Sequence, residues 1–434
     1  MPWRIVSGIA IHDEIVIVPV RRSLDATVEV PGSKSITNRA LLLAALASGR
    51  SIIERALISD DTRHMSEVLS ALGFNLETDE SAQRIAVDGL GGRIPSPGAE
   101  LCVGGAGTAM RFIAGMLTLS RGRFRMDGNE QMRRRPVGPL LDALQRLGAS
   151  IYSERENGCP PVIVDTTRGA FEGGETTIDA RVSSQFVSAL LMPAPLWPRG
   201  VTLHVHGDTA RPFIDMTLKL MSVWGVTSRT EEHSIIVRGR QSYRAQCYVV
   251  EPDASSANYF AAAAALIGGR VRIKGIAPDS VQGDIGFLAL LARMGAAVVW
   301  RDGGVEVTGT GKLAGIDVEM TAMPDMVATL AAVAPFASSI TRIRGVGFIR
   351  HHESDRIRAI ATELKRLGAT VRQTDDGLEI EPSKLTSAAI ETYDDHRIAM
   401  SFALTGLKLA GVRIKNPDCV AKTFPKFFEK LASL

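Results

Sequence analysis

The 434-residue sequence predicts an α/β fold built from repeated units, and two series of helices carry that prediction. In the first series, an amphipathic helix ends in Leu-Gly or a similar pair before a Val- or Ile-rich run, as in LLDALQRLGASI and IATELKRLGATV. Glycine there suits the left-handed residue that closes a helix, and the run that follows suits a strand. These glycines recur at intervals of roughly 70 residues: Gly73, Gly148, Gly225, Gly295 and Gly368.

The second series consists of more apolar helices that alternate with the first. Its six members are NRALLLAALASG, AMRFIAGMLTLSRG, QFVSALLMPAPLWPRG, ANYFAAAAALIGG, DMVATLAAVAPFASS and RIAMSFALTGLKLAG. They end at the same interval, so the sequence predicts six copies of an α/β unit of roughly 70 residues, each with two helices and several short strands. Helices that are apolar almost all round should be buried, with the amphipathic helices outside them.

Composition restricts the class of protein. The length favours two or three domains, and 45% apolar residues can form a large core. A net charge of +3 does not indicate a nucleic-acid-binding surface. The scattered Cys102, Cys159, Cys247 and Cys419 form neither a C-x-x-C pair nor a disulfide framework, which favours thiols in a reducing compartment. With no signal-peptide pattern and no run of roughly 18 apolar residues, we expect a soluble, cytoplasmic protein with no membrane partner.

Polar residues gather just before each apolar helix, in SKSITNR, GGAGTAMR, VSSQ, DASSAN, MPDM and YDDHR. One capping residue would suffice for each helix. Helix N-termini attract anions, so if these ends converge they would form a cleft for a highly anionic ligand. The cations that could serve this cleft are Lys34, Arg39, Arg111, Arg133, Arg134, Arg135, Arg356, Arg397 and Lys422. Among them lie Asp325, Glu353 and Asp395, which are candidates for proton transfer.

The stretch VPGSKSITNR is not a P-loop. A P-loop needs a glycine directly before its lysine and another five residues earlier, but Ser33 and Val28 occupy these places. Two interpretations of Lys34 remain from this stretch alone: an anion site at a helix N-terminus, or a solvated lysine beside an ordinary N-cap.

Taken in order, the motifs resemble those of the 5-enolpyruvylshikimate-3-phosphate synthase family over nearly the whole chain. They are PGSKSITNRALLLAALASG, AGTAMR, RRPVG, VSSQF, DASSANYF, QGD, PD, HESDR, YDDHRIAM and AKTFP. The resemblance implies a two-domain inverted α/β barrel-like fold of six βαβαββ repeats, three per domain. Residues 1–32 and 253–434 would form discontinuous domain I, residues 33–252 would form domain II, and the hinges would lie near 32 and 252.

The implied reaction transfers the enolpyruvyl group of phosphoenolpyruvate to the 5-hydroxyl of shikimate 3-phosphate, in the shikimate pathway to aromatic amino acids. It runs by addition and elimination through a tetrahedral intermediate, with no metal and no organic cofactor. The resemblance implies Lys34, Asp325 and Glu353 as catalytic residues and a monomer that binds only its small-molecule substrates. Domain I would hold the phosphoenolpyruvate carboxylate and the acid–base groups, and domain II the shikimate 3-phosphate.

The resemblance also implies two sets of binding residues. Phosphoenolpyruvate would contact Lys34, Gly107, Arg135 and Gln185 through its phosphate, and Arg356, Arg397 and Lys422 through its carboxylate. Shikimate 3-phosphate would contact Lys34, Ser35, Arg39, Ser183, Ser184, Gln185 and Asp325. His396, between Asp395 and Arg397, is expected to shape the site.

Some positions depart from the family pattern. Ala210 and Phe213 stand where the family has serine and tyrosine, so two hydroxyls expected near the shikimate ligand are missing, and Thr209 or Arg211 would have to compensate. Gly105 and Phe112 replace a common asparagine and proline, which predicts altered sensitivity to glyphosate. His352 replaces a common lysine and makes one positive charge dependent on pH.

Other interpretations stay open at this point. The sister enolpyruvyl transferase acting on UDP-N-acetylglucosamine uses a loop cysteine, and the segment GNEQMRRRP contains none. A metal protein is suggested by His351, His352, Asp355 and His396, although adjacent histidines point apart in a regular element. A catalytically silent homologue, or a transferase for a modified shikimate-like alcohol, would fit the missing hydroxyls.

Overall fold

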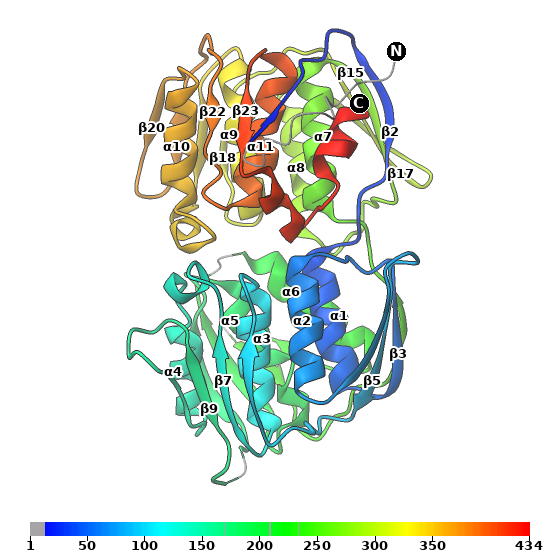
Figure 1. Ribbon diagram of the computed structural model, residues 1–434, viewed down its shortest axis with the longest axis vertical. Helices are drawn as coiled ribbons and strands as arrows, with labels where there is room; N and C mark the ends of the chain where they lie inside the picture. The colour runs from blue at the N-terminus through cyan, green and yellow to red at the C-terminus, as the bar shows by residue number, and fades with distance from the viewer. Residues whose placement is uncertain (1–13, 170, 208–209, 233) are drawn as a thin grey trace. The chain divides into compact units, whose positions relative to one another are not determined.

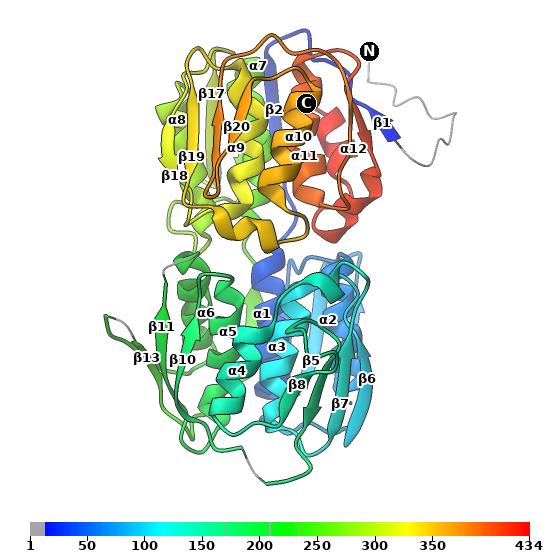
Figure 2. The same cartoon turned by 90° about the vertical axis from the view of Figure 1, so that its left-hand side faces the viewer.

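The computed structural model describes residues 14–169, 171–207, 210–232 and 234–434. Its described residues divide into two units. Unit 2 is the continuous segment Gly32–Glu251, whereas unit 1 joins the segment that ends at Pro31 to Pro252–Leu434. In Figures 1 and 2 each unit has helices inside and sheets around them.

The predicted apolar helices form the interior of the two units. They are α1 (Lys34–Leu46), α3 (Gly107–Met116) and α5 (Ser184–Leu191) in unit 2, and α7 (Ala254–Ile267), α9 (Val327–Val333) and α11 (His396–Lys408) in unit 1. All ten residues of α3 are buried, and so are 13 of the 14 residues of α7. The alanine run of α7 lets neighbouring helices approach closely, and Phe260 on the same helix packs against Phe424 and Phe427.

The amphipathic helices pack outside this layer, as the sequence predicts. They are α2 (Asp60–Ala71), α4 (Gly138–Arg146), α6 (Arg211–Val223), α8 (Phe287–Arg293) and α10 (Arg356–Arg366), and a short α12 (Phe427–Ala432) follows near the C-terminus. The glycine after each of the first five has a positive φ, between 85° at Gly368 and 110° at Gly295. The predicted left-handed closures are therefore confirmed.

Unit 2 contains three four-stranded sheets, in the orders β14-β3-β5-β4, β6-β7-β9-β8 and β10-β11-β13-β12. Each sheet contains one parallel pair of strands, and the other two strands are antiparallel. In the second and third sheets, a buried helix connects the two parallel strands along the chain. The strands are β3 (Ser48–Glu54), β4 (Asn75–Asp79), β5 (Arg84–Leu90), β6 (Gly98–Cys102), β7 (Arg123–Asp127), β8 (Ile151–Ser153), β9 (Val162–Asp165), β10 (Gly174–Asp179), β11 (Val201–His206), β12 (Arg229–Thr230), β13 (Ser234–Val237) and β14 (Cys247–Val249).

Unit 1 repeats this pattern, with the orders β16-β17-β15-β2, β18-β19-β21-β20 and β1-β23-β22. In the last sheet, β1 lies antiparallel to β23 and takes the place of the usual hairpin. The strands are β1 (Glu14–Val16), β2 (Leu24–Val28), β15 (Gly269–Lys274), β16 (Ala297–Arg301), β17 (Gly304–Gly309), β18 (Asp317–Glu319), β19 (Thr341–Arg344), β20 (Val371–Gln373), β21 (Leu378–Ile380), β22 (Ala389–Ile390) and β23 (Arg413–Lys415). The described residues thus contain the six α/β repeats that the helix intervals predict.

Two connecting segments run between the units. The Ser33 amide donates to the Glu251 carbonyl at 2.8 Å, and the Asp253 amide donates to the Pro31 carbonyl at 2.8 Å. Gly32 lies so close to its neighbours that an added Cβ would be 2.0 Å from the Arg55 carbonyl oxygen, so only glycine fits. Within the described ranges, no helix combines the length and apolarity that crossing a membrane requires.

Candidate functional site

The first turn of α1 in unit 2 presents the lysine of the opening motif. Lys34 is the first residue of the helix, and its Nζ lies 3.1 Å from an Oδ of Asp61 in the first turn of α2. The two side chains are only 12% and 4% exposed. A largely buried ion pair at a helix N-terminus favours the anion-site interpretation of Lys34 over a solvated lysine.

Arg39 is fully buried one turn further along α1. Its Nε donates to Thr217 Oγ1 at 2.7 Å, and its Nη atoms donate to Ser188 Oγ and to the carbonyls of Ser35 and Phe213. Burial lowers the pKa of Arg39 to about 9. Because these partners are neutral hydroxyl and carbonyl oxygens, an anionic ligand would supply the charge compensation that this guanidinium lacks among them.

Four residues around the first turns of α3 and α5 form what we term the phosphate cluster: Gly107, Arg111, Arg135 and Gln185. Arg111 Nη1 donates to Gln185 Oε1 at 2.8 Å, which joins the two helices. A Cβ added to Gly107 would lie 2.6 Å from Arg111 Nη1 and 2.8 Å from Arg135 Nη1. Two buried guanidinium groups therefore lie against the N-terminus of α3, an arrangement suited to phosphate.

Ser183 and Ser184 begin the neighbouring helix α5. Ser183 is its N-cap and accepts a hydrogen bond from the Gln185 amide at 3.2 Å, and Ser184 is buried. Contacts between first turns also join α1 to α3, because Asn38 donates to Thr108 Oγ1 at 2.7 Å. The three buried helices of unit 2 thus gather their N-termini, and the predicted residues from SKSITNR, AGTAMR and VSSQ come together there.

In unit 1, five residues form what we term the carboxylate–arginine cluster: Asp325, Glu353, Arg356, Asp395 and Arg397. Arg356 is at its centre. Its Nη1 donates to Asp325 at 2.9 Å, its Nη2 to Glu353 at 2.8 Å, and its Nε to Asp395 at 2.9 Å.

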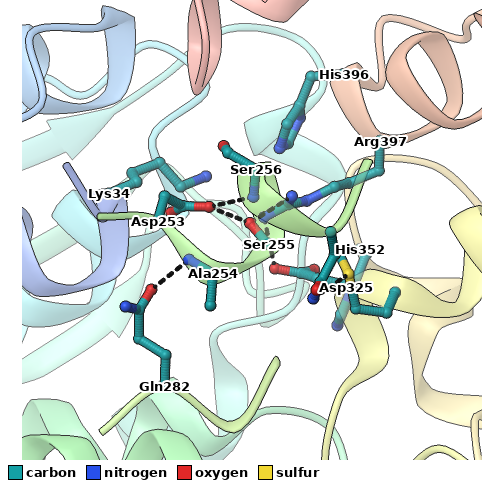
Figure 3. Close-up of polar contacts among 12 residues, drawn as sticks. Lys34, Asp253, Ala254, Ser255, Ser256, Gln282, Asp325, His352, His396 and Arg397 are labelled. Carbon is teal, nitrogen blue, oxygen red and sulfur yellow. Dashed lines mark hydrogen bonds and ion pairs between the residues drawn. The ribbon is translucent and has the colours of Figure 1, made fainter. Parts of the chain in front are cut away.

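Arg397 binds the second oxygen of Asp325, and Figure 3 shows these two side chains next to Ser255. Its Nη2 donates to Asp325 Oδ2 at 2.9 Å, and its Nη1 donates to Ser255 Oγ at 2.7 Å and Tyr259 Oη at 3.1 Å. Ser255 in turn donates to Asp253, the N-cap of α7. The first turns of α7 and α11 and the residues before α9 therefore meet at one place within unit 1.

The charges in this cluster support one another. Burial alone would lower the pKa of Arg356, but the charges of Asp395, Glu353 and Asp325 raise it above the ordinary arginine value. Burial likewise opposes the charge of Arg397, whereas Asp325 holds the pKa of Arg397 well above its usual range. Both arginines remain cations, so they can bind a carboxylate if Asp325 yields its place or becomes protonated.

Glu353 and Lys422 complete this region. The Lys422 Nζ lies 4.0 Å from Glu353 Oε1, and the side chains are 11% and 9% exposed. His352 approaches from the same loop, with its Nδ1 3.1 Å from Arg356 Nη1. Because an arginine N–H always donates, this contact requires the His352 tautomer in which Nδ1 is the acceptor.

Asp395, a candidate for proton transfer, is enclosed by its hydrogen-bond partners. Asp395 is 0% exposed, and its two oxygens accept from Arg356, from Ser354 Oγ and from the Arg397 amide. It therefore orients Arg356 and caps α11. His396 beside it is also buried, with its Nδ1 3.8 Å from an Asp395 oxygen.

The family departures have clear structural places. The Phe112 ring lies 5.1 Å from the Arg39 guanidinium, so this side chain packs against Arg39. Ala210 is the left-handed N-cap of α6, and Phe213 contributes its backbone carbonyl to Arg39. Arg211 pairs with Asp215 on the same helix at 2.9 Å, and Thr209 falls outside the described residues.

Sequence reasoning missed three residues that hold the predicted ones, and a fourth that interacts with them only through its charge. Asp61 pairs with Lys34, and Ser255 and Tyr259 hold Arg397. The fourth is Asp284, which is buried with Oδ1 lacking a hydrogen-bond partner among the described residues. The QGD motif and the polar start of α7 were the signals available, but spacing alone does not tell which partner each residue meets.

The residues that the structure describes contain no group of three or more His, Cys, Asp and Glu side chains able to hold a metal ion. The phosphate cluster gathers cations at helix N-termini, and the carboxylate–arginine cluster pairs buried arginines with carboxylates.

Comparison with known proteins identifies the class. The family model for EPSP synthase (3-phosphoshikimate 1-carboxyvinyltransferase) matches residues 19–431. The chain is 46% identical over 420 residues to the 3-phosphoshikimate 1-carboxyvinyltransferase of Nostoc sp., covering 96% of this chain and 98% of that one. It is 47% identical over 417 residues to the enzyme of that name from Yersinia pseudotuberculosis, covering 95% and 96%.

A solved structure agrees. The EPSP synthase of Acinetobacter baumannii superimposes with a TM-score of 0.81 at 27% identity, covering 97% of this chain and 98% of that one. Fold and site thus define a transferase of two α/β units that binds anionic substrates. The chain belongs to the EPSP synthase (3-phosphoshikimate 1-carboxyvinyltransferase) family.

Proposed function

We propose that this chain transfers the enolpyruvyl group of phosphoenolpyruvate to the 5-hydroxyl of shikimate 3-phosphate and releases phosphate. The observation that carries the proposal is the pair of buried arginines, Arg356 and Arg397, that share Asp325 within 2.9 Å. Such a group can bind a substrate carboxylate while Asp325 takes a proton. Family membership over nearly the full length supports the same reaction.

The phosphate of phosphoenolpyruvate would be held in unit 2 by Lys34, Gly107, Arg135 and Gln185. The carboxylate would be held in unit 1 by Arg356, Arg397 and Lys422. Shikimate 3-phosphate would bind Ser35, Arg39, Ser183 and Ser184, with further contacts from Lys34, Gln185 and Asp325. The two substrates together bring about four to five negative charges, which these cations balance.

In the addition step, Asp325 would take the proton of the 5-hydroxyl while the hydroxyl oxygen bonds to C2 of phosphoenolpyruvate. Glu353, assisted by Lys34, would protonate the methylene carbon, which gives a tetrahedral intermediate. In the elimination step, Glu353 would take a proton back from the methyl group as the C–O bond to phosphate breaks. The double bond re-forms, and the proton of the hydroxyl leaves with the phosphate.

The proposal extends to the setting of the enzyme. We propose a monomer in the cytoplasm that needs no partner beyond its substrates. The four cysteines are free thiols in the structure, which supports a reducing compartment.

A second acceptor is favoured by one observation. Ala210 and Phe213 offer no side-chain hydroxyl, and Arg211 is paired with Asp215. A shikimate 3-phosphate analogue altered on the ring would suit a pocket that lacks those two hydroxyls.

Phosphate release tests both candidates. Purified enzyme is given phosphoenolpyruvate with one of four acceptors: shikimate 3-phosphate, a ring-modified analogue of it, unphosphorylated shikimate, or UDP-N-acetylglucosamine. We expect turnover with the first acceptor only. Folded protein that is inactive with shikimate 3-phosphate would contradict the proposal, and turnover with a ring-modified analogue alone would favour the second acceptor.

A matched pair of variants tests the carboxylate site. Arg356→Lys should raise the KM for phosphoenolpyruvate by more than about tenfold, because a lysine cannot reach three carboxylates at once. Arg350→Lys is the control, since Arg350 lies in the preceding turn and pairs with the half-exposed Asp355. Equal KM values for the two variants would argue against carboxylate binding by Arg356.

A further inference from the structure

A tight turn precedes α11 and carries residues of the carboxylate–arginine cluster. It runs from Thr392 to Asp395, and the Asp395 amide donates to the Thr392 carbonyl at 2.8 Å. Its central residues, Tyr393 and Asp394, have φ angles of 56° and 53°. Turns with two positive φ angles favour glycine and asparagine, so a tyrosine there costs conformational energy that the surroundings must offset.

The turn is anchored by Glu363 of α10, whose side chain is 0% exposed. Tyr393 Oη donates to Glu363 Oε1 at 2.7 Å, and the Glu391 amide donates to Oε2 at 3.1 Å. Arg366 lies 3.3 Å from the same carboxyl group. Burial raises the pKa of Glu363, while the bonds from Tyr393 and Glu391 oppose that rise and favour the carboxylate.

A second set of contacts holds the other side of the turn. Asn416, itself at a φ of 44°, donates to Asp394 Oδ1 at 3.2 Å, and Lys415 pairs with Glu391. The strained conformation is thus held from α10 and from the segment after β23.

The turn positions the N-terminal end of α11. It places Asp395 where both of its oxygens bind Arg356, and it starts the helix so that Arg397 reaches Asp325. A shift of the turn would move Asp395 and Arg397 together, and Arg356 would lose its partner at Nε.

We propose that Tyr393 and Glu363 are positioning residues for the carboxylate-binding arginines, acting through the strained turn between them. This inference rests on the proposed function for its kinetic consequence. Tyr393 is 41% exposed and does not belong to the core, so its hydroxyl serves the turn and contributes little to packing.

Tyr393→Phe is the first test, because it removes only the hydroxyl. We expect the KM for phosphoenolpyruvate to rise about fivefold to tenfold, in keeping with loss of a hydrogen bond to a carboxylate. The KM for shikimate 3-phosphate and the thermal midpoint should stay near wild-type values. Tyr152→Phe is the matched control, since Tyr152 is 42% exposed in unit 2, and it should change none of these values.

The anchor is tested by two substitutions of Glu363. Glu363→Gln should approach wild type, because the amide can accept from the Glu391 N–H and donate to the Tyr393 oxygen. Glu363→Ala should show the defect of Tyr393→Phe or a larger one. Equal KM values for the Gln and Ala variants would overturn the anchoring role, and Tyr393→Phe keeps the test open if the Ala variant does not fold.

Hydrogen exchange of backbone amides in residues 391–397 separates this inference from the proposed function. We expect faster exchange in Tyr393→Phe than in the wild type. If the wild-type protein does not turn over the two substrates, only the proposed function is overturned. The comparison of hydrogen exchange between Tyr393→Phe and the wild type would then decide whether Tyr393 anchors the turn. Unchanged exchange with an unchanged KM for phosphoenolpyruvate, or an equal rise of both KM values with a lower thermal midpoint, would overturn the positioning role.

Discussion

Gly107 shows how one missing side chain lets two arginines lie against a helix N-terminus. It is the first residue of α3, and the guanidinium groups of Arg111 and Arg135 occupy the space that a Cβ would fill. Any larger residue must push at least one arginine away from the helix N-terminus, where phosphate is bound most strongly.

Gly107→Ala should therefore raise the KM for phosphoenolpyruvate about tenfold, since one charge-assisted contact to phosphate would be displaced. Gly138→Ala is the control: Gly138 also begins a helix, but its nearest neighbour would lie 3.6 Å from the added carbon. Steady-state kinetics of both variants decide the matter. A normal KM in Gly107→Ala would mean that the arginines tolerate the methyl group and that the cradle is looser than described.

The buried Asp284 predicts that the unfolding free energy depends on pH. Burial raises its pKa from 3.8 to about 8, the charges of Asp325 and Asp253 add to the rise, and Arg397 and Arg356 oppose it. At pH values between 3.8 and about 8, the folded state therefore keeps a proton on Asp284 that the unfolded state has released. The stabilisation that protonated Asp284 contributes is complete below its pKa in the unfolded state. It is lost as the pH rises through its pKa in the folded state.

The wild type should thus lose more unfolding free energy than Asp284→Asn between about pH 5 and about pH 8. Urea unfolding at the two pH values measures the difference. Asp279→Asn, at an exposed position of the same segment, should keep the wild-type slope. If Asp284→Asn and the wild type lose equal amounts, Asp284 ionises normally in the folded protein.

Residue types could be predicted from the sequence better than residue partners. Lys34, Arg356 and Arg397 stand out as cations near helix starts, and the structure pairs each of them with a carboxylate there. Asp395 appeared equally suited to proton transfer, yet it is fully enclosed by Arg356 and Ser354. Whether a carboxylate faces solvent or an arginine depends on contacts between segments far apart in the chain, which local spacing does not contain.

At the scale of elements, helices were easier to predict than strands. The six apolar helices and the glycine closures follow from periods of 3.6 residues and from one special backbone conformation. Strand β1 is different, because three residues carry little pattern and their partner β23 lies at the other end of the chain. The sequence therefore predicts the repeat, but not that the N-terminal segment completes the sixth sheet.

The contribution of that segment can be measured at Ile17, directly after β1. Ile17 is 6% exposed. It packs so closely on Gly406 of α11 that a Cβ added to Gly406 would lie 2.5 Å from the Cβ of Ile17. Ile17→Ala should lower the unfolding free energy by about 3 kcal/mol through lost burial and the cavity left behind.

Val16→Ala is the control, because Val16 is 57% exposed. It should change the unfolding free energy by less than about 0.5 kcal/mol. Denaturant melts of the two variants compare them directly. Equal destabilisation would mean that β1 contributes through its backbone pairing and not through the Ile17 side chain.

At the scale of the whole molecule, the two units differ in continuity. Unit 2 is one segment that contains all strands of its three sheets, including β14 beside β3. Unit 1 needs β1 and β2 from the N-terminal segment to complete two of its sheets. Repeat intervals predict six similar pieces, but they do not reveal that three sheets take a strand (β14, β2 or β1) from outside the local repeat.

A fragment of residues 32–251 should therefore fold alone and unfold cooperatively in urea. A fragment of residues 252–434 should be less ordered, because β15 and β23 each lose one of their two neighbouring strands. A peptide of residues 14–31 added in trans should restore its structure. Circular dichroism and urea melts test both statements. A cooperative transition in the 252–434 fragment without the peptide would contradict the second.

The pairing of β2 with β15 also has a consequence for synthesis on the ribosome. β2 is complete by residue 28, but its partner begins at residue 269, after all of unit 2 has been made. At usual translation rates this wait lasts roughly tens of seconds, long enough for unit 2 to fold first. For that time the N-terminal strands are nascent chain without a sheet, and a chaperone that shields short apolar segments would find its substrate there.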